Sequence, residues 1–349
     1  MVVGIKDIAA HLGLSTSTVS RALNDYDDVA PETARRVEEA ARALGYYPSA
    51  SARNLRRRRT GKIGLALLYD AAFATFNEFF AELIRLIAAA IEREDYNLVL
   101  YTRAGESAAK LMRIAQAREV DGLLLLGDAP WQEQVQDDLL AAGLPFAYLH
   151  RTIVDPRVSF ITADNRAGGR LAARHLLELG HRRIGYVGFT AHSRSSLERL
   201  TGLHEALEEA GIRYDPSLIA HASLEPGSGA RAALSLLDLP VPPTAIFAFN
   251  DRLAMEALLA ISERGLHVPQ DIAVVGFDDI RSSRMTVPPL TTIHQPLEVI
   301  AEQAVRALLA GGAGDGVSAP LRLVIPVELV VRGSTVAEHT AASSAAVRA

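Results

Sequence analysis

The chain has 349 residues, of which 49% are hydrophobic and none is cysteine. This length can fill two or three cores, while the lack of cysteine excludes disulfides and thiolate metal sites and fits a reducing compartment. No apolar run reaches the ~18 residues of a membrane span, and none at the start resembles a signal sequence, so we expect a cytoplasmic protein with no membrane partner. The net charge of −5 divides into +4 for residues 1–62 and −9 for the rest, a basic head on an acidic body.

Residues 4–24, with the sequence GIKDIAAHLGLSTSTVSRALN, predict two short helices joined by a tight turn. Ile8 and Leu12 fall at helical spacing, which gives the first helix an apolar face. Gly13 lies where the chain must turn, because glycine adopts a positive φ at little steric cost. Ser15 is a suitable N-cap for the second helix, since its hydroxyl can accept a backbone N–H of the first turn.

The second of these helices indicates what the unit does. Val19 and Leu23 face the core, whereas Thr16, Ser17 and Arg21 point outward together. This arrangement is typical of a DNA-reading helix-turn-helix, whose second helix enters the major groove near its N-terminus. The alternative is a small helical hairpin that contacts a protein partner.

A third helix is expected within residues 29–55, VAPETARRVEEAARALGYYPSASARNL. Pro31 begins it, it runs to about Leu44, and Gly45 follows its end. Here the sequence closely resembles the lactose-repressor (LacI) family of bacterial transcription regulators. The matching residues are KDIAAHLGLSTSTVSRALN, VAPETARRVEEAARALGYYPS and a set described below, so that the resemblance covers residues 4–336.

The resemblance implies that the head binds double-stranded operator DNA. Base discrimination is expected above all from Arg21, which is long enough to reach the O6 and N7 atoms of a guanine. The expected DNA contacts in the head are Lys6, Ser15, Thr16, Ser17, Ser20, Arg21 and Asn24.

The linker that follows corresponds in the family to a hinge helix that folds on DNA and pushes an apolar wedge into the minor groove. Leu55 matches this wedge, Ala52 packs beside it, and Arg56 is a further expected DNA contact. The arginine run at 56–59 is either a solvated linker or a set of phosphate contacts. The sequence leaves both roles open.

From Ile63 onward, short apolar runs alternate with amphipathic helical stretches. The runs are IGLALL, YNLVLY, DGLLLLG, LPFAYL, RIGYVGF, TAIFAF and IAVVGF. Apolar runs of this length between helices are typical of parallel strands buried on both faces. Because the pattern starts again near Asp164, we expect an α/β chain: a small all-α helix-turn-helix head followed by two doubly wound parallel-sheet lobes.

The resemblance also implies how the lobes are connected. The chain is expected to cross between them near residues 161–165, 290–295 and 324–328, which gives a clamshell like a periplasmic sugar-binding protein. The tail at 337–349 is small, polar and expected to be disordered, and without leucine heptads it favours a homodimer over a tetramer. The expected parts are a DNA-binding domain at 1–47, a hinge at 48–61, lobe one at about 62–162 and 293–325, and lobe two at about 163–291 and 326–336.

Ligands of open α/β sheets bind beyond the carboxyl ends of the strands, so the residues after each strand are candidates for a pocket. Aromatic faces and planar hydrogen-bonding groups there suit a sugar, whose C–H face stacks while its hydroxyls need donors and acceptors. The residues at these places are Tyr69, Asp70, Phe73, Phe76, Asn77, Trp131, His150, Arg151, Phe189, Arg199, Asn250, Asp251, Asp278 and Asp279. Those expected to bind the effector are Asp70, Phe73, Phe76, Trp131, His150, Arg151, Phe189, Arg199, Asn250 and Asp278.

Three of these residues match ligand-anchoring positions of the family. Arg199 matches an arginine that forks onto ligand oxygens, and Asn250 and Asp278 match the amide and carboxylate beside it. Such residues can instead cap the helix that follows, and that alternative stays open. His150 stands where many relatives carry aspartate, so the identity of their ligand cannot be assigned to this chain. The Asp-Asn pair at 164–165 is a family hallmark for which a structural and a ligand role are equally expected.

No catalytic motif accompanies these residues. The sequence contains no GxSxG elbow, no Walker loop and no GxGxxG after a strand. His175 and His181 flank a helix end, where a histidine can lie beside the carbonyl dipole, and they lack the further ligands of a metal site. We therefore expect no enzyme activity, no metal and no cofactor.

The function expected is a ligand-responsive regulator that binds a near-palindromic operator as a dimer. The relatives are mostly repressors released by a sugar, so the first expectation is a repressor of carbohydrate-utilisation genes. In the alternative, a purine or other metabolite promotes DNA binding. A transport-class sugar-binding protein would not need residues 1–60, and an α/β enzyme would need a catalytic constellation.

Overall fold

A computed structural model describes residues 3–23, 26, 28–46, 59–68, 77–127, 129, 131–189, 193–312 and 319–336. The chain divides into two compact units, Met1–Lys62 and Ile63–Ala349, here called the head and the sensor. Among the described residues, no helix is long and apolar enough to cross a membrane. The predictions that lie outside the described residues are those for Asn24, Ala52, Leu55, Arg56, Tyr69, Asp70, Phe73, Phe76 and the tail.

The head consists of three helices: α1 (Ile5–Leu12), α2 (Thr16–Ala22) and α3 (Pro31–Ala43). They pack through a small apolar core that includes Ile8, Val19 and Val37. The turn between α1 and α2 uses Gly13 at φ 67°, and the Ser15 hydroxyl caps α2 by accepting from the Thr18 N–H at 3.0 Å. The predicted helix-turn-helix is confirmed, and α3 ends one residue before the expected Leu44.

Lobe one of the sensor is built on a six-stranded sheet in the order β11-β5-β4-β3-β1-β2. The pairs β1–β3, β3–β4, β4–β5 and β5–β11 are parallel. The strands are β1 (Lys62–Leu67), β2 (Asn97–Tyr101), β3 (Gly122–Leu126), β4 (Phe146–Leu149), β5 (Ser159–Ala163) and β11 (Arg322–Ile325); the helices are α6 (Glu78–Arg93), η1 (Ala104–Glu106), α7 (Ala108–Ala117), α8 (Gln136–Ala142) and α13 (Leu297–Gly312).

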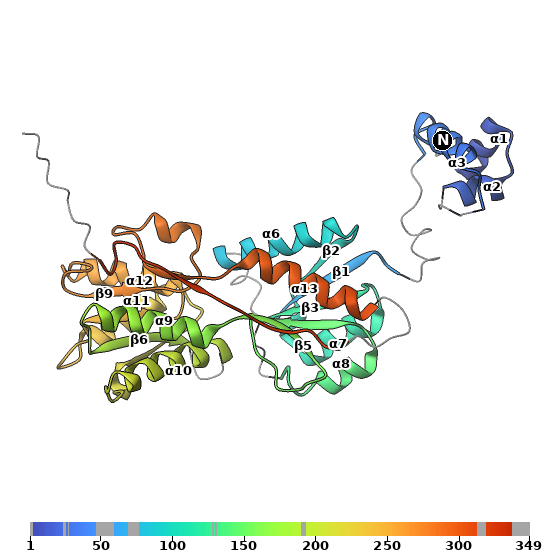
Figure 1. The fold of residues 1–349 in the computed structure, drawn as a ribbon. Coiled ribbons are helices and arrows are strands. Elements are labelled where there is room, and N and C mark those ends of the chain that lie inside the picture. Colours follow the sequence, from blue (N-terminus) through green and yellow to red (C-terminus); the bar gives the residue numbers. More distant parts are fainter. Residues whose placement is uncertain are drawn as a thin grey trace, which may run out of the picture. The chain divides into compact units, whose positions relative to one another are not determined.

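Lobe two repeats this plan with a four-stranded parallel sheet in the order β7-β6-β8-β9. Its helices lie against the sheet as they do in lobe one (Figure 1). The strands are β6 (Ile184–Phe189), β7 (Ile219–Ala222), β8 (Ala245–Ala248) and β9 (Ala273–Val275); the helices are α9 (Asn165–Glu178), α10 (Arg194–Glu209), η2 (Pro216–Leu218), α11 (Ser228–Leu237), α12 (Asp251–Glu263) and η3 (Arg281–Arg284).

Three segments run between the lobes. The first leads from β5 into α9; the second leads from β10 (Thr292–His294) into α13; the third leads from β11 into β12 (Glu328–Val330). The second and third segments pair with each other, since β10 and β12 form an antiparallel two-stranded sheet. Figure 1 shows the two lobes side by side, joined by these strands.

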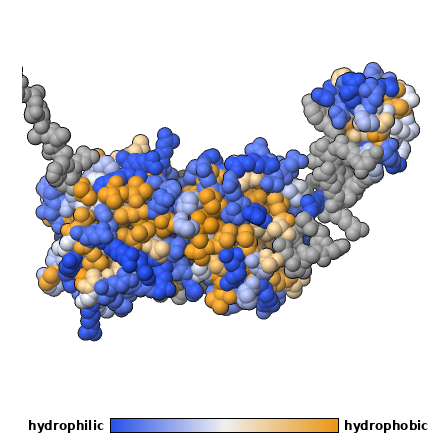
Figure 2. Space-filling view, viewed as in Figure 1, coloured by the Kyte–Doolittle hydropathy of each residue, from blue (hydrophilic) through white to orange (hydrophobic). Residues whose placement is uncertain are grey.

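The predicted runs of apolar residues form the sheet interiors. All five residues of β3 and all four of β8 are buried, as expected for parallel strands covered by helices on both faces. Hydrophobic residues also gather in patches on the outside of both lobes (Figure 2). Exposed apolar side chains of the described residues include Leu224, Leu259, Met285 and Val287. The α/β fold with two parallel-sheet lobes is confirmed.

Candidate functional site

The outer face of α2 in the head carries the residues that sequence reasoning assigned to DNA. Thr16, Ser17 and Arg21 are exposed, while Val19 is buried under them. Lys6 on α1 is also exposed, whereas Ser20 on α2 is partly buried. The helix thus presents short hydroxyls and one long cation to solvent.

Arg21 has an acidic partner, Asp28, that the sequence did not predict. Its Nε donates to Asp28 Oδ1 at 3.1 Å and its Nη2 donates to Oδ2, while its guanidinium lies 4.9 Å from the centre of the Tyr26 ring. The side chains of Arg21 and Asp28 are 45% and 53% exposed, so this ion pair contributes at most about 1 kcal/mol to stability. A base edge can therefore compete with Asp28 for Arg21.

Arg199 is the centre of the candidate effector site in the sensor. It is only 3% exposed and lies on α10, which packs tightly against α9. The guanidinium is fixed by hydrogen bonds and by aromatic faces. Its Nε donates to Asn165 Oδ1 at 2.9 Å and its Nη1 to the Phe249 carbonyl at 2.5 Å. The ring centres of Phe249 and Phe277 are 4.3 Å and 3.5 Å away.

Asp278 follows the carboxyl end of β9 and faces Arg199. Its Oδ1 is 3.9 Å from Arg199 Nη1 and accepts a hydrogen bond from Gln295 Nε2 at 2.7 Å. The backbone adopts φ 122°, a conformation rare for an L-residue and typical of a functionally constrained site. Burial raises the pKa of Asp278 to about 7, although Arg199 and Gln295 favour the charged form. The carboxyl can therefore change its charge near neutral pH.

The two neighbouring aspartates have structural roles. Burial and the nearby Asp278 charge raise the pKa of Asp251, whose carboxylate accepts from the Thr292 hydroxyl at 2.5 Å and the Ile280 N–H at 2.9 Å. Asp279 binds Arg332 at 2.5 Å and His294 at 3.1 Å. Both aspartates therefore hold the segments beside the second crossing in place.

Asn250 performs the capping role that remained open for it. Its Oδ1 accepts from the Leu253 N–H at 2.9 Å, at the start of α12. The residue is 5% exposed and directly follows Phe249, whose carbonyl binds Arg199. Because the cap uses only the oxygen, the amide nitrogen is available for a ligand role.

His150 contributes to the site from lobe one. It adopts φ 62°, and its ring lies edge-on to Phe79 at 4.9 Å between centres. Its Nε2 is buried and finds no hydrogen-bond partner among the described residues. Burial and the Arg199 charge lower the pKa of His150 to about 3, so the imidazole is neutral and can serve a ligand as donor or acceptor.

The other predicted residues divide into two groups. Phe189 joins the Arg199 cluster, because its ring meets Phe249 edge-on at 4.8 Å. Trp131 instead packs against the lobe-one core, and Arg151 binds Glu133 at 2.9 Å with its guanidinium 5.9 Å from the Tyr148 ring centre.

Sequence reasoning missed the residues that complete the cluster, namely Phe249, Phe277 and Gln295. Gln295 directly follows β10, within the predicted second crossing, and its Oε1 is buried without a partner among the described residues. Its place at a crossing was the only available signal. The two phenylalanines ended predicted strands, TAIFAF and IAVVGF, and therefore looked like core residues.

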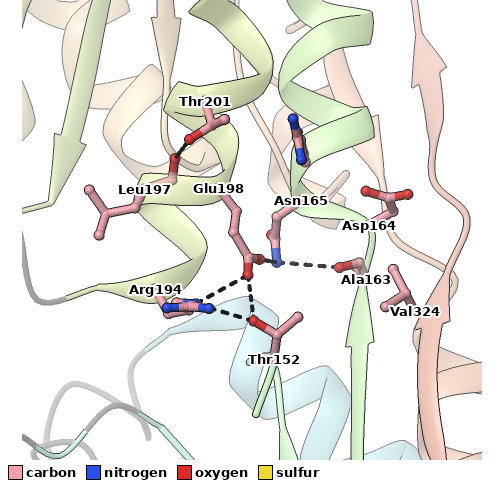
Figure 3. A pocket seen from close by; sticks show the side chains of 10 residues that line it. Thr152, Ala163, Asp164, Asn165, Arg194, Leu197, Glu198, Thr201 and Val324 are labelled. Atoms are coloured by element: carbon pink, nitrogen blue, oxygen red, sulfur yellow. Dashed lines mark hydrogen bonds and ion pairs between the residues drawn. The ribbon is translucent and has the colours of Figure 1, made fainter. Parts of the chain in front are cut away.

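A hollow of about 450 Å³ opens beside this cluster at the first crossing. Figure 3 shows its polar side chains, with Thr152 from lobe one facing Arg194 and Glu198 on α10. Asn165 and Asp164 line the same hollow. The Asp164 carboxylate caps α9 by accepting from the Ala167 N–H at 2.8 Å, which is a structural role, one of the two that the sequence left open for the Asp164–Asn165 pair.

The two histidines flanking the end of α9 form ordinary hydrogen bonds. His175 pairs with Thr335 at 2.8 Å and His181 with Thr244 at 2.9 Å. Within the described parts of the chain, no group of three or more His, Asp or Glu side chains could hold a metal ion.

Two family models match the two units of the chain. The first describes bacterial regulatory proteins of the lacI family and matches residues 4–49. The second describes a periplasmic binding protein-like domain and matches residues 173–335. The transcriptional regulator CelR of Thermobifida fusca is 34% identical over 333 residues, covering 94% of this chain and 96% of CelR. The chain belongs to the lacI family of bacterial regulatory proteins.

Other relatives agree with this assignment. The transcriptional repressor PurR of Haemophilus influenzae is 34% identical and covers 95% of this chain and 98% of PurR. A structure described as a CelR–cellobiose complex has a TM-score of 0.72 at 32% identity, covering 95% of this chain and 99% of the other. A structure of the lac repressor dimer bound to operator and the anti-inducer ONPF has a TM-score of 0.83 at 28% identity. The match covers 97% of this chain and 100% of the lac repressor chain. The predicted family is confirmed, and these relatives are regulators rather than enzymes.

Proposed function

We propose that this lacI-family regulator binds a near-palindromic operator as a homodimer, with α2 of each head in the major groove. The exposed face of Thr16, Ser17 and Arg21 supports this role, as does the similarity to a lac repressor dimer on its operator. A guanine that accepts two hydrogen bonds from Arg21 would contribute ~1–3 kcal/mol of discrimination. The regulator would act in the cytoplasm, with the head, hinge and lobes divided as the sequence predicts.

The effector proposed for the sensor is a sugar. The observation that carries this proposal is the buried cluster of Arg199 and Asp278, in which a cation and a carboxyl lie 3.9 Å apart among aromatic rings. Fixed donors and acceptors beside ring faces match the hydroxyls and C–H faces of a sugar. The Nε2 of His150, which has no hydrogen-bond partner in the described part of the chain, offers one more hydrogen-bonding atom from lobe one. The CelR–cellobiose complex supports the same chemistry.

A thermal-shift panel tests this proposal. Cellobiose, other di- and monosaccharides, and purines are added to the full chain and to the variants Asp278→Asn and Arg199→Ala. A ligand at 100 times its Kd adds ~2.7 kcal/mol of stability, which raises the melting temperature visibly. A sugar that stabilises the wild type but neither variant supports the proposal.

Two other outcomes count against the sugar proposal. A purine that stabilises the wild type would favour the alternative, in which the ligand promotes DNA binding. A sugar that stabilises the wild type and both variants equally would remove the Arg199 cluster from the effector site.

A further inference from the structure

One hydrogen bond in the hollow of Figure 3 joins the two lobes directly. Thr152 follows β4 in lobe one, and its hydroxyl donates to Glu198 Oε1 on α10 of lobe two at 2.6 Å. The same hydroxyl accepts from Arg194 Nε at 3.2 Å. Because the hydroxyl has only one proton, both neighbours together fix its direction. This contact is separate from the three chain crossings, so it can form or break as the lobes move.

The other oxygen of Glu198 belongs to a second chain of contacts. Its Oε2 accepts from Asn165 Nδ2 at 3.1 Å, and Asn165 Oδ1 accepts from Arg199 Nε at 2.9 Å. A carboxylate can only accept hydrogen bonds, so Glu198 requires the amide nitrogen of Asn165 to face it. The amide oxygen is then directed at Arg199.

We propose that Glu198 is a positioning residue that links the effector anchor to the contact between the lobes. Through Asn165 it orients Arg199, and through Thr152 it holds lobe one. A ligand that draws Arg199 away from Asn165 therefore weakens the Thr152 contact, and lobe opening in turn releases Arg199, as reciprocal coupling requires. The inference rests on the proposed effector role of Arg199, but its test measures the distance between the lobes with no ligand added.

A second contact between the lobes provides a calibration. The hydroxyl of Ser282 in η3 donates to Glu78 Oε2 at 2.6 Å, and its N–H donates to Glu78 Oε1 at 3.2 Å. Glu78 starts α6 in lobe one. Neither Ser282 nor Glu78 takes part in the hydrogen bonds that join Thr152, Glu198, Asn165 and Arg199, so Ser282→Ala weakens the contact between the lobes without removing any of them.

The distance between the lobes can be measured without a ligand by double electron–electron resonance between two spin labels. The chain has no cysteine, so Asp138→Cys in α8 and Arg213→Cys after α10, both at exposed positions, accept one spin label each. The full chain is diluted with unlabelled protein, so that distances within one subunit dominate. Glu208→Ala is the matched control, because Glu208 is an exposed glutamate on the same helix as Glu198.

The Thr152→Val variant should shift the ratio of open to closed lobes at least about tenfold, because it loses the hydrogen bond to the charged Glu198 and the longer one from Arg194. Thr152→Ser should match the wild type, because it keeps the hydroxyl. Glu198→Ala should act like Thr152→Val, and the double variant should add little to either. Asn165→Ala should shift the distance in the same direction, while Glu208→Ala should not.

Two results would overturn the proposal. An unchanged distance in Thr152→Val would show that Glu198 does not hold the lobes, and a change in Ser282→Ala alone would assign that hold to the contact between Ser282 and Glu78. A shift in Thr152→Val without any shift in Asn165→Ala would disconnect the lobe contact from Arg199. Failure of every sugar in the thermal-shift panel would contradict the proposed effector but would leave these ligand-free distances unaffected.

Discussion

Gly169 on α9 lies directly against the backbone carbonyl of Arg199 on α10. A Cβ at this position would overlap the Arg199 carbonyl oxygen, and a Cβ at Gly202 would overlap the carbonyl of Arg166 on the opposite helix. Glycine is thus required at both positions for a close backbone approach. This contact fixes the part of α10 that carries Arg199, so the packing of two helices determines the position of the effector anchor.

Replacing Gly169 with alanine should therefore affect both stability and ligand binding. The added methyl group forces α9 and α10 apart, and overpacking of this kind costs about 1–3 kcal/mol. Urea unfolding monitored by circular dichroism measures the loss. The control is Glu178→Ala, an exposed position at the end of α9, which should change stability by less than about 0.5 kcal/mol. Equal stabilities of the two variants would contradict the close packing.

The two roles of Asn250 can be separated by substitution. Asn250→Ala removes the oxygen that caps α12 and should cost about 1 kcal/mol of stability. Asn250→Asp keeps a capping oxygen but lacks the amide nitrogen, so its unfolding midpoint should stay near that of the wild type while effector affinity falls. Calorimetric titration with the sugar found in the panel measures that affinity. Unchanged affinity in Asn250→Asp would leave Asn250 as a cap alone.

The raised pKa of Asp278 predicts a pH dependence of stability. Burial raises this pKa from 3.8 to about 7, so between these pH values the folded protein holds a proton that the unfolded chain has released. The contribution of this group to stability is therefore fully present below pH 3.8 and is lost as the pH rises through about 7. The lowered pKa of His150 has the opposite effect, because it makes stability rise with pH. The contribution of Asp278 is therefore found by comparing the wild type with a variant of Asp278.

Asp278→Asn should accordingly gain stability relative to the wild type when the pH is raised from 5.5 to 8. Urea midpoints at the two pH values measure this difference. Asp155 provides the control, because hydrogen bonds from Arg157 lower its pKa to about 2 and Asp155→Asn should show no such trend in this range. A parallel pH dependence in the wild type and Asp278→Asn would contradict the titration of Asp278.

The pair of Arg21 and Asp28 predicts a gain of DNA affinity on substitution. Asp28→Asn removes the carboxylate that competes with DNA for Arg21, and an exposed ion pair of this kind is worth up to about 1 kcal/mol, or about fivefold in Kd. Fluorescence anisotropy with a labelled duplex at fixed salt measures the change. Glu32→Gln, which removes the same charge from a head glutamate bound to Arg35, controls for the general electrostatic effect. An equal gain of DNA affinity in both variants would show that the gain comes from the change in net charge.

The features that could be predicted from sequence are those set by neighbouring residues. The head helices follow from apolar spacing around Ile8 and Val19 and from the Ser15 cap, and the sheet strands follow from their apolar runs. These signals act within a few residues, so periodicity and turn chemistry reveal them. The two-lobed plan followed from the alternation of strands and helices that starts again near Asp164, whereas the order of the strands within each sheet was not predicted.

The candidate site is less visible because its contacts join distant parts of the chain. Arg199 lies against Phe277 and Asp278, almost eighty positions later, and Gln295 enters from a crossing strand. No local pattern distinguishes Phe249 or Phe277 from core residues. The contact between Arg21 and Asp28 was missed for a similar reason, since it depends on the path of the chain after α2.

A linked titration of DNA and effector tests most directly whether Arg199 couples the effector to the operator. An operator is selected from a pool of random duplexes with the full chain, and its Kd is measured by anisotropy with and without the sugar from the thermal-shift panel. We expect the sugar to change the operator Kd of the wild type by at least about fivefold and to leave that of Arg199→Lys unchanged. The same Kd ratio in both proteins would contradict the claim that Arg199 connects the effector to the operator.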